Sequence, residues 1–131
     1  MTRAGGPYTI AEVDREHLPG VMRLFVAEAW SYGADEDRTW RALTAPGTLA
    51  LVALVDGEVA GIAQTIGDGE IQAFLSVLLV AVDARRRGIA RALVEEALRR
   101  TPGSRLDLIS CADGFYEALG FKPVSGFRLT R

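Results

Sequence analysis

The spacing of hydrophobic and polar positions predicts two helices after a short first strand. A β-rich run from Tyr8 to Val13 precedes apolar residues that recur at helical spacing between Leu18 and Ala29. Pro19 fits the first turn of that helix. A second helix is expected to begin near Asp35, whose side chain can cap it, and to end before Pro46.

The middle of the chain predicts three strands. Thr48 to Val55 and Glu58 to Ile66 are β-rich runs joined by Asp56-Gly57, a pair that accepts the positive φ angles of a tight hairpin turn. The next run, Ile71 to Val82, is almost continuously apolar. Such a run indicates a central strand that is covered on both faces.

The last third predicts a helix, a strand, a short helix and a terminal strand or pair. The corresponding ranges are Ala90 to Leu98, Leu106 to Ser110, Gly114 to Gly120 and Phe121 to Thr130. This order of elements favours an α/β (α+β) fold, in which a mixed and mostly antiparallel central sheet carries helices on both faces. We expect residues 1–131 to form a single domain.

Composition excludes several classes of protein. The chain has 131 residues, 49% of them hydrophobic, and a net charge of −2, which argues against a disordered chain and a globally basic nucleic-acid binder. The longest apolar run, Ala73 to Val82, is far shorter than the roughly 20 residues of a transmembrane helix. The N-terminus lacks the apolar core of a signal peptide, and the single Cys111 has no partner for an intrachain disulfide. We therefore expect a cytoplasmic protein with no membrane partner.

The most informative segment joins the central strand to the following helix through Arg85-Arg86-Arg87-Gly88. The first turn of a helix has unpaired N–H groups and a positive dipole end, which together stabilise an anion. Small residues at Gly88 and Ala90 leave the backbone open to a phosphate, and the arginines add steering. The segment predicts a pyrophosphate site.

Three other interpretations compete for this segment. The arginines could simply be solvated, although cations at a helix N-terminus are unfavourable without an anion. The P-loop pattern and the G-x-G-x-x-G dinucleotide pattern are both absent. Recognition of DNA by the helix is disfavoured because Glu95 and Glu96 lie among its few cations.

Two motifs in order identify a family resemblance. The pattern R/Q-x-x-G-x-G/A falls on Arg85, Gly88 and Ala90, and Phe115 to Phe121 is similar to a segment F-Y-x-x-L-G-F. Both resemble the GNAT superfamily of N-acetyltransferases, and the order of predicted elements matches that family from the first strand onward. The resemblance implies a GNAT-like acyl-CoA N-acyltransferase fold that uses acetyl-CoA and needs no metal.

The resemblance also implies which residues hold the cofactor. In this family the loop amides bind the pyrophosphate, and the preceding strand pairs through its backbone with the pantetheine arm. Val82 stands where the family often has proline. Carried over to this sequence, the cofactor-binding residues are Leu78, Leu79, Val80, Arg85, Arg86, Arg87, Gly88, Ile89, Ala90 and Arg91.

The chemistry implied is direct attack of an amine on the thioester. A backbone N–H near Leu79 or Val80 would stabilise the oxyanion, and Tyr116 would protonate the departing thiolate. No general base is evident, because the strand position where the family often places an acid holds Ser76. Asp68 and Glu70 are fallback candidates that more simply belong to a solvated turn.

The acceptor site would be built by the first two helices and the terminal strands. An aromatic and acidic mixture there would suit a cationic amine, but the simpler interpretation puts Trp40 in the core and leaves the acidic residues solvated. His17 and Cys111 are expected to be bystanders. The residues concerned are Phe25, Glu28, Trp30, Tyr32, Asp35, Glu36, Asp37 and Trp40.

The resulting functional hypothesis is an acetyl-CoA-dependent N-acetyltransferase that acts on a primary amine of a small molecule or a protein. The alternative is a non-catalytic acyl-CoA-binding sensor or interaction module with the same fold. The expected partners are acetyl-CoA and an amine acceptor, without nucleic acid, and a homodimer is left open.

Overall fold

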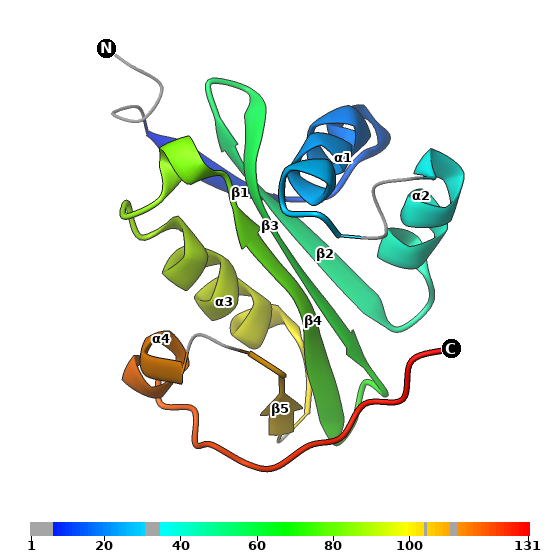
Figure 1. The fold of residues 1–131 in the computed structure, drawn as a ribbon, viewed down its shortest axis with the longest axis vertical. Helices are drawn as coiled ribbons and strands as arrows, with labels where there is room; N and C mark the ends of the chain where they lie inside the picture. Colours follow the sequence, from blue (N-terminus) through cyan, green and yellow to red (C-terminus); the bar gives the residue numbers. More distant parts are fainter. Residues whose placement is uncertain (1–6, 31–34, 104, 111–112) are drawn as a thin grey trace.

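Five strands form one sheet in the order β1-β2-β3-β4-β5 (Figure 1). The computed structural model describes residues 7–30, 35–103, 105–110 and 113–131. The first four strands pair antiparallel with their neighbours, and β5 is parallel to β4. The strands are β1 (Tyr8–Glu12), β2 (Thr48–Val55), β3 (Glu58–Gly67), β4 (Gln72–Val80) and β5 (Arg105–Asp107). This arrangement confirms the predicted mixed, mostly antiparallel sheet.

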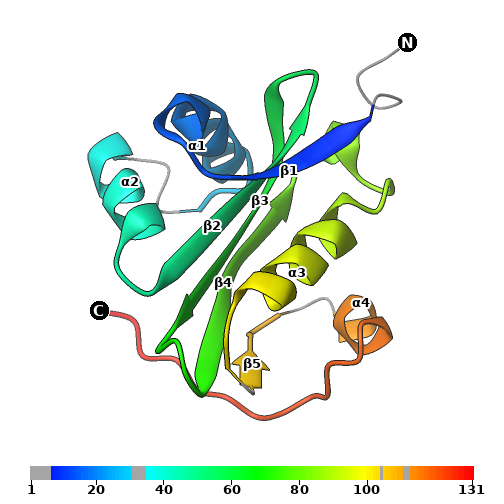
Figure 2. The same ribbon diagram turned by 180° about the vertical axis from the view of Figure 1, so that it is seen from behind.

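Helices cover both faces of the sheet (Figures 1 and 2). The first face carries α1 (Leu18–Ala27) and α2 (Glu36–Thr44), and the second carries α3 (Ile89–Arg100) and the short α4 (Asp113–Ala118). Two 3-10 turns, Arg15–His17 and Val82–Ala84, precede α1 and follow β4. The predicted two-faced architecture is therefore confirmed.

The two faces have separate hydrophobic cores because side chains alternate along each strand. On β2, Leu51 and Val55 belong to the core under α3, whereas Val52 belongs to the core under α1 and α2. Phe25 on α1 and Leu93 on α3 are completely buried. Each fully buried side chain of this size contributes about 1.5 to 3 kcal/mol.

Two local predictions are confirmed at residue level. Asp56 and Gly57 adopt φ angles of 52° and 79° in the turn between β2 and β3, which pair antiparallel from Val55 and Glu58 onward. The side chain of Asp35 accepts a 3.0 Å hydrogen bond from the N–H of Arg38 and so caps α2.

The prediction of a terminal strand or pair over Phe121 to Thr130 is wrong. The structure has no strand over 121–131, and Val124, Phe127 and Leu129 are exposed by 77%, 99% and 82%. Ser125-Gly126 interrupts the apolar alternation, and β5 has only three residues to offer as a pairing partner. The segment instead runs past β5 toward the start of β4 (Figure 1).

Candidate functional site

A tight loop connects the end of β4 to the start of α3. Gly88 is the N-cap of α3 and adopts a left-handed conformation with φ of 81°, and Arg86 is also left-handed with φ of 65°. A left-handed conformation costs an L-residue about 1 to 2 kcal/mol, whereas glycine adopts it freely. Gly88 therefore has a backbone role in addition to the open approach that the sequence suggested.

The N-terminus of α3 presents main-chain donors that the helix does not use. The first intrahelical bond runs from the N–H of Ala92 to the carbonyl of Gly88 at 2.9 Å, so the amides of Ile89, Ala90 and Arg91 precede the helical ladder. Within the described part of the chain, no side chain caps this end of α3. Backbone amides in this arrangement can bind an anion.

The start of α3 packs closely against β3 and β4 because the β3 residue at this contact, Gly61, has no side chain. A Cβ at Gly61 would lie 3.3 Å from Cγ2 of Ile89 and 3.1 Å from the carbonyl oxygen of Leu79. Both distances are at the limit of close contact, so a larger residue would push the helix away. The absence of a side chain keeps the helix N-terminus beside the end of β4.

One edge of β4 is open next to this helix end. The β5 strand pairs only with Gln72, Ala73 and Phe74, so in the described part of the chain no strand pairs with the other edge of β4 from Leu75 to Val80. An open strand edge offers N–H and C=O groups to an extended ligand.

The register shows which backbone groups face that open edge. The N–H of Ala81 donates to the carbonyl of Ala60 at 2.8 Å, and antiparallel pairing alternates from there, so Leu79 faces β3. Leu78 and Val80 therefore direct their backbone groups away from β3. Of the three strand residues predicted to bind the cofactor, these two are placed to pair with a ligand.

The side chain of Arg85 binds other parts of the protein. Its Nε donates a 3.0 Å hydrogen bond to the carbonyl of Val80, and its guanidinium forms an ion pair with the carboxylate of Glu28 in the C-cap position of α1. The pair joins the loop to the first helix. This contact could not be predicted from local sequence patterns, because the two residues are 57 positions apart.

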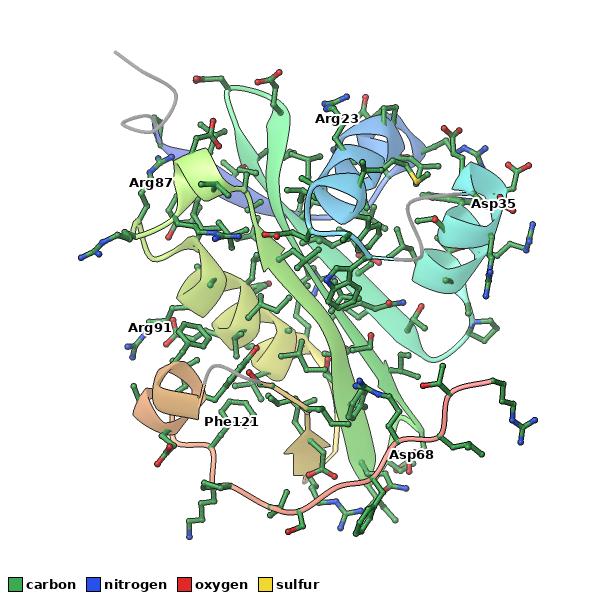
Figure 3. The ribbon with its side chains drawn as sticks, in the orientation of Figure 1. Arg23, Asp35, Asp68, Arg87, Arg91 and Phe121 are labelled. Carbon is green, nitrogen blue, oxygen red and sulfur yellow. The ribbon has the colours of Figure 1, made fainter. Side chains whose placement is uncertain are left out.

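Two other cations of this segment lie near the loop or on the helix that follows it. Arg91 forms an ion pair with Glu95 one turn further along α3, with 3.4 Å between Nε and Oε2. Figure 3 shows Arg87 beside the loop and Arg91 on the outer side of α3. These side chains supply positive charge on the side of the molecule where the α3 amides emerge.

Tyr116 lies on α4, between two aromatic rings. Its ring meets those of Phe115 and Phe121 edge to face, with centroid separations of 4.9 and 5.6 Å. Burial raises the pKa of the phenol above its ordinary value of 10.0. Tyr116 therefore stays protonated at neutral pH and can donate a hydrogen bond or a proton.

Tyr116 also lines a cavity of about 510 Å³ beside the sheet. The cavity reaches Phe74 on β4 and is also lined by the segment that follows α4. Its other walls include Leu108, Ser110, Glu117 and Phe127. The cavity therefore connects α4 with the part of β4 at which the open edge begins.

Ser76 occupies a bulge in β4, opposite a buried polar residue that sequence reasoning missed. The register shifts between Gln64 and Thr65, which pair with Val77 and Leu75, so Ser76 is the extra residue. Ser76 donates to the side-chain oxygen of Gln64 at 3.2 Å. The only available signal was a polar residue inside an otherwise apolar β-rich run.

Asp68 stabilises a turn and is a poor candidate for a base. One of its carboxylate oxygens accepts hydrogen bonds from the N–H groups of Glu70, Ile71 and Gln72 at 2.8, 2.8 and 3.2 Å. These bonds hold the pKa of Asp68 below its ordinary value of 3.8. Figure 3 shows Asp68 at the opposite end of the sheet from Arg87.

Replacing Asp68 with alanine is expected to lower the melting temperature at pH 7 by a few degrees. Because the folded-state pKa is depressed, the carboxylate contributes stability above pH 3.8, and that contribution is lost as the pH falls through the folded-state pKa. Thermal unfolding from pH 7 down to about pH 2 checks this expectation. The difference between the Asp68→Ala and wild-type melting temperatures should narrow as the pH falls below 3.8, and a difference that stays constant over the whole range would contradict it.

Most of the residues expected at the acceptor site have structural roles. Phe25 is buried and stacks on Trp30 at 6.0 Å, and Trp40 is half-buried with Arg15 over its ring at 5.3 Å. Asp37 forms an ion pair with Arg15 at 3.6 Å. These contacts favour the simpler interpretation, in which the aromatic residues pack and the acidic residues cap or pair.

The remaining candidates are also bystanders or lie outside the described residues. His17 accepts a 2.9 Å hydrogen bond at Nδ1 from the N–H of Asp14 and so completes a capping box, a structural role that sequence reasoning missed. Tyr32 and Cys111 lie outside the described residues.

The described residues contain no group of three or more His, Cys, Asp or Glu side chains that could hold a metal ion. None of the helices in the described ranges combines the length and the apolar character needed to cross a bilayer.

Comparison with known families identifies the class of protein. Residues 46–123 match the model of the acetyltransferase (GNAT) domain, which spans β2 to the end of α4. The chain therefore belongs to the GNAT acetyltransferase family. A search of curated proteins found no match.

Solved structures confirm the fold. A GNAT-family acetyltransferase from Streptococcus pneumoniae is 24% identical, with a TM-score of 0.78 over 95% of this chain and 98% of that one. An aminoglycoside N-acetyltransferase solved in complex with CoA is 20% identical, with a TM-score of 0.76 over 97% and 95% of the two chains. A ribosomal-protein-alanine N-acetyltransferase from Brucella melitensis is 20% identical, with a TM-score of 0.74 over 95% and 99%.

Proposed function

We propose that this protein transfers the acetyl group of acetyl-CoA to a primary amine by direct attack in a ternary complex. The observation that carries the proposal is the uncapped N-terminus of α3 beside the open edge of β4. Family membership supports acetyl-CoA as the acetyl donor, and a protein of similar fold has been solved with CoA bound.

Two parts of the chain would hold the donor. The amides of residues 86–91 would bind the pyrophosphate, since those of Ile89, Ala90 and Arg91 precede the helical ladder. The backbone groups of Leu78 and Val80 would pair with the pantetheine arm as a neighbouring strand does. Arg85 would support the part of the β4 edge that binds the pantetheine arm, because its Nε already binds the carbonyl of Val80.

The chemistry requires one bond to form and one to break. The amine lone pair forms the C–N bond, a backbone N–H at the open edge stabilises the oxyanion, and the C–S bond then breaks. The thiolate takes a proton from the Tyr116 hydroxyl, and the nitrogen loses a proton to solvent, from which the tyrosinate is reprotonated. The net products are an N-acetyl amide and free CoA thiol.

The burial of Tyr116 suits this role. A phenol whose pKa lies above 10.0 is protonated at neutral pH, whereas an ordinary thiol has a pKa near 8.5. Transfer to the thiolate is uphill at equilibrium, so the tyrosine acts by stabilising the developing charge and passing a proton that solvent restores. The cavity beside Tyr116 reaches β4 at Phe74, where the open edge of that strand begins.

Calorimetric titration with acetyl-CoA, followed by a thiol-release screen over primary amines, tests the proposal. We expect saturable binding of acetyl-CoA and thiol release that depends on an added amine. Tight binding without amine-dependent release over the whole panel would favour the non-catalytic acyl-CoA-binding module. Absence of binding would contradict both functions.

A further inference from the structure

We propose that Ser76 binds the attacking amine and that Gln64 positions the Ser76 hydroxyl for this task. The inference rests on the acetyl transfer proposed above and assigns the amine side of the same site. Ser76 interrupts the regular pairing of β4, and the side chain of Gln64 is exposed by only 1%. Bulges beside active sites commonly redirect a side chain, and a fully buried amide must have its hydrogen bonds satisfied.

The length of the donor places the thioester next to Ser76. The pantetheine arm, from phosphate to sulfur, has the length of about four residues of extended chain, or about 13 Å. It would enter beside Val80, because Ile89 at the start of α3 packs against Gly61, the register partner of Val80. Ser76 lies four residues before Val80 on β4, at the position where the thioester would then be.

Hydrogen bonding fixes the direction of the Ser76 hydroxyl. The side-chain nitrogen of Gln64 donates to the carbonyl of Ala42 on α2 at 2.7 Å, so its amide oxygen is the end that meets Ser76. That oxygen accepts from the Ser76 hydroxyl at 3.2 Å, and the backbone oxygen of Gln64 lies 3.3 Å from the same hydroxyl. Both partners are acceptors, so Ser76 is the donor and its lone pairs are left to accept.

An acceptor at this position suits an attacking amine. A neutral primary amine must direct its lone pair at the thioester carbon, and an oxygen that accepts one of its N–H groups holds it in that orientation. The nitrogen becomes positively charged as the C–N bond forms, so its N–H becomes a stronger donor. The hydrogen bond therefore strengthens in the transition state and raises kcat. Ser76 takes no proton in this step.

A buried hydroxyl on the neighbouring strand position provides a matched control. Thr65, which follows Gln64, bonds through its hydroxyl to the hydroxyl of Thr101 at 2.8 Å, at the C-terminal end of α3. The substitution Thr65→Val removes this hydrogen bond from β3 and changes neither Ser76 nor Gln64. A purely structural effect of losing a buried hydroxyl should appear in this variant as well.

The test compares Ser76→Ala, Ser76→Thr, Gln64→Met and Thr65→Val with the wild type. Thiol release is measured at saturating acetyl-CoA with 2-phenylethylamine and alanine amide as the varied acceptors, and acetyl-CoA affinity is measured by calorimetry. Ser76→Ala should lower kcat/KM for the amine by about 10- to 100-fold, the size of one hydrogen bond to a reacting group. Its affinity for acetyl-CoA should stay within about twofold of the wild type.

The remaining variants separate positioning from packing. Ser76→Thr keeps the hydroxyl and should recover most of the activity, and Gln64→Met should lower kcat/KM for the amine in the same direction as Ser76→Ala. Thr65→Val should lower the melting temperature without a specific change in the amine kinetics.

The outcomes also separate this inference from the proposed function. Unchanged amine kinetics in Ser76→Ala, with amine-dependent release in the wild type, would overturn the role of Ser76 and leave acetyl transfer intact. A loss of acetyl-CoA affinity in Ser76→Ala would overturn it too, by placing the hydroxyl on the donor. A wild type that binds acetyl-CoA but releases no thiol with these two amines or with any other amine of the panel would overturn both proposals.

Discussion

Replacing Tyr116 with phenylalanine is expected to lower kcat for acetyl transfer by about 10- to 1,000-fold, the range for loss of one general acid. The change removes only the hydroxyl, and the ring keeps its contacts with Phe115 and Phe121. The affinity for acetyl-CoA, measured by calorimetry, should therefore change little. Steady-state thiol release at saturating amine and acetyl-CoA gives kcat.

Thr65→Val is the control for this variant. It removes a buried hydroxyl that bonds to the hydroxyl of Thr101 at the C-terminal end of α3, and it should leave kcat unchanged. Equal kcat values for Tyr116→Phe and wild type at every pH tested would contradict the assignment of Tyr116. A drop in acetyl-CoA affinity that accounts for the whole loss of rate would contradict it as well.

The raised pKa of Tyr116 gives an independent check. Burial disfavours the charged phenolate. The stability that the neutral Tyr116 phenol contributes is therefore lost only as the pH rises above 10.0 and through the folded-state pKa. The tyrosinate absorbance that distinguishes wild type from Tyr116→Phe should develop above pH 10.0. Development of that difference below pH 10.0 would show that the phenol is not held in a desolvated environment.

Replacing Gly88 with glutamate is expected to lower the affinity for acetyl-CoA by about 100-fold or more. A carboxylate at the N-cap of α3 would place negative charge where the pyrophosphate is expected, and like charges about 4 Å apart repel by about 4 kcal/mol near a protein surface. The left-handed φ of 81° adds strain for any side chain. Calorimetric titration of acetyl-CoA measures the effect.

Gly57→Glu separates charge at the site from backbone strain. Gly57 has a φ of 79° in the β2–β3 turn, and no atom lies within 4 Å of the position its Cβ would take. This variant carries the same new charge and similar strain at a position outside the proposed site. It should lose comparable stability and keep full affinity, whereas normal affinity in a folded Gly88→Glu variant would contradict the role of the loop.

Features set by neighbouring residues could be predicted from the sequence. The turn at Asp56-Gly57 and the cap at Asp35 depend on backbone preferences within a few positions, and both are confirmed. The sequence also predicts the loop from Arg85 to Gly88 between a strand and a helix, and the structure has it there. Local chemistry was sufficient at each of these sites.

Features that depend on the packing of distant segments could not be predicted in this way. The pairing of Arg85 with Glu28 and the bonds from Gln64 to α2 and β4 join residues that only the folded sheet brings together. The part that His17 plays in a capping box likewise depends on the 3-10 turn before α1. The prediction of a terminal strand is wrong because apolar spacing alone does not supply a pairing partner. The strand β5 has only three residues to offer.

The central claim is that main-chain amides at the start of α3 bind the pyrophosphate of acetyl-CoA. A crystal structure at saturating acetyl-CoA tests it most directly. We predict phosphate oxygens about 2.7 to 3.2 Å from the amide nitrogens between Gly88 and Arg91, with the pantetheine arm along Leu78 and Val80. A cofactor bound at another surface, or an empty loop at saturation, would contradict the claim.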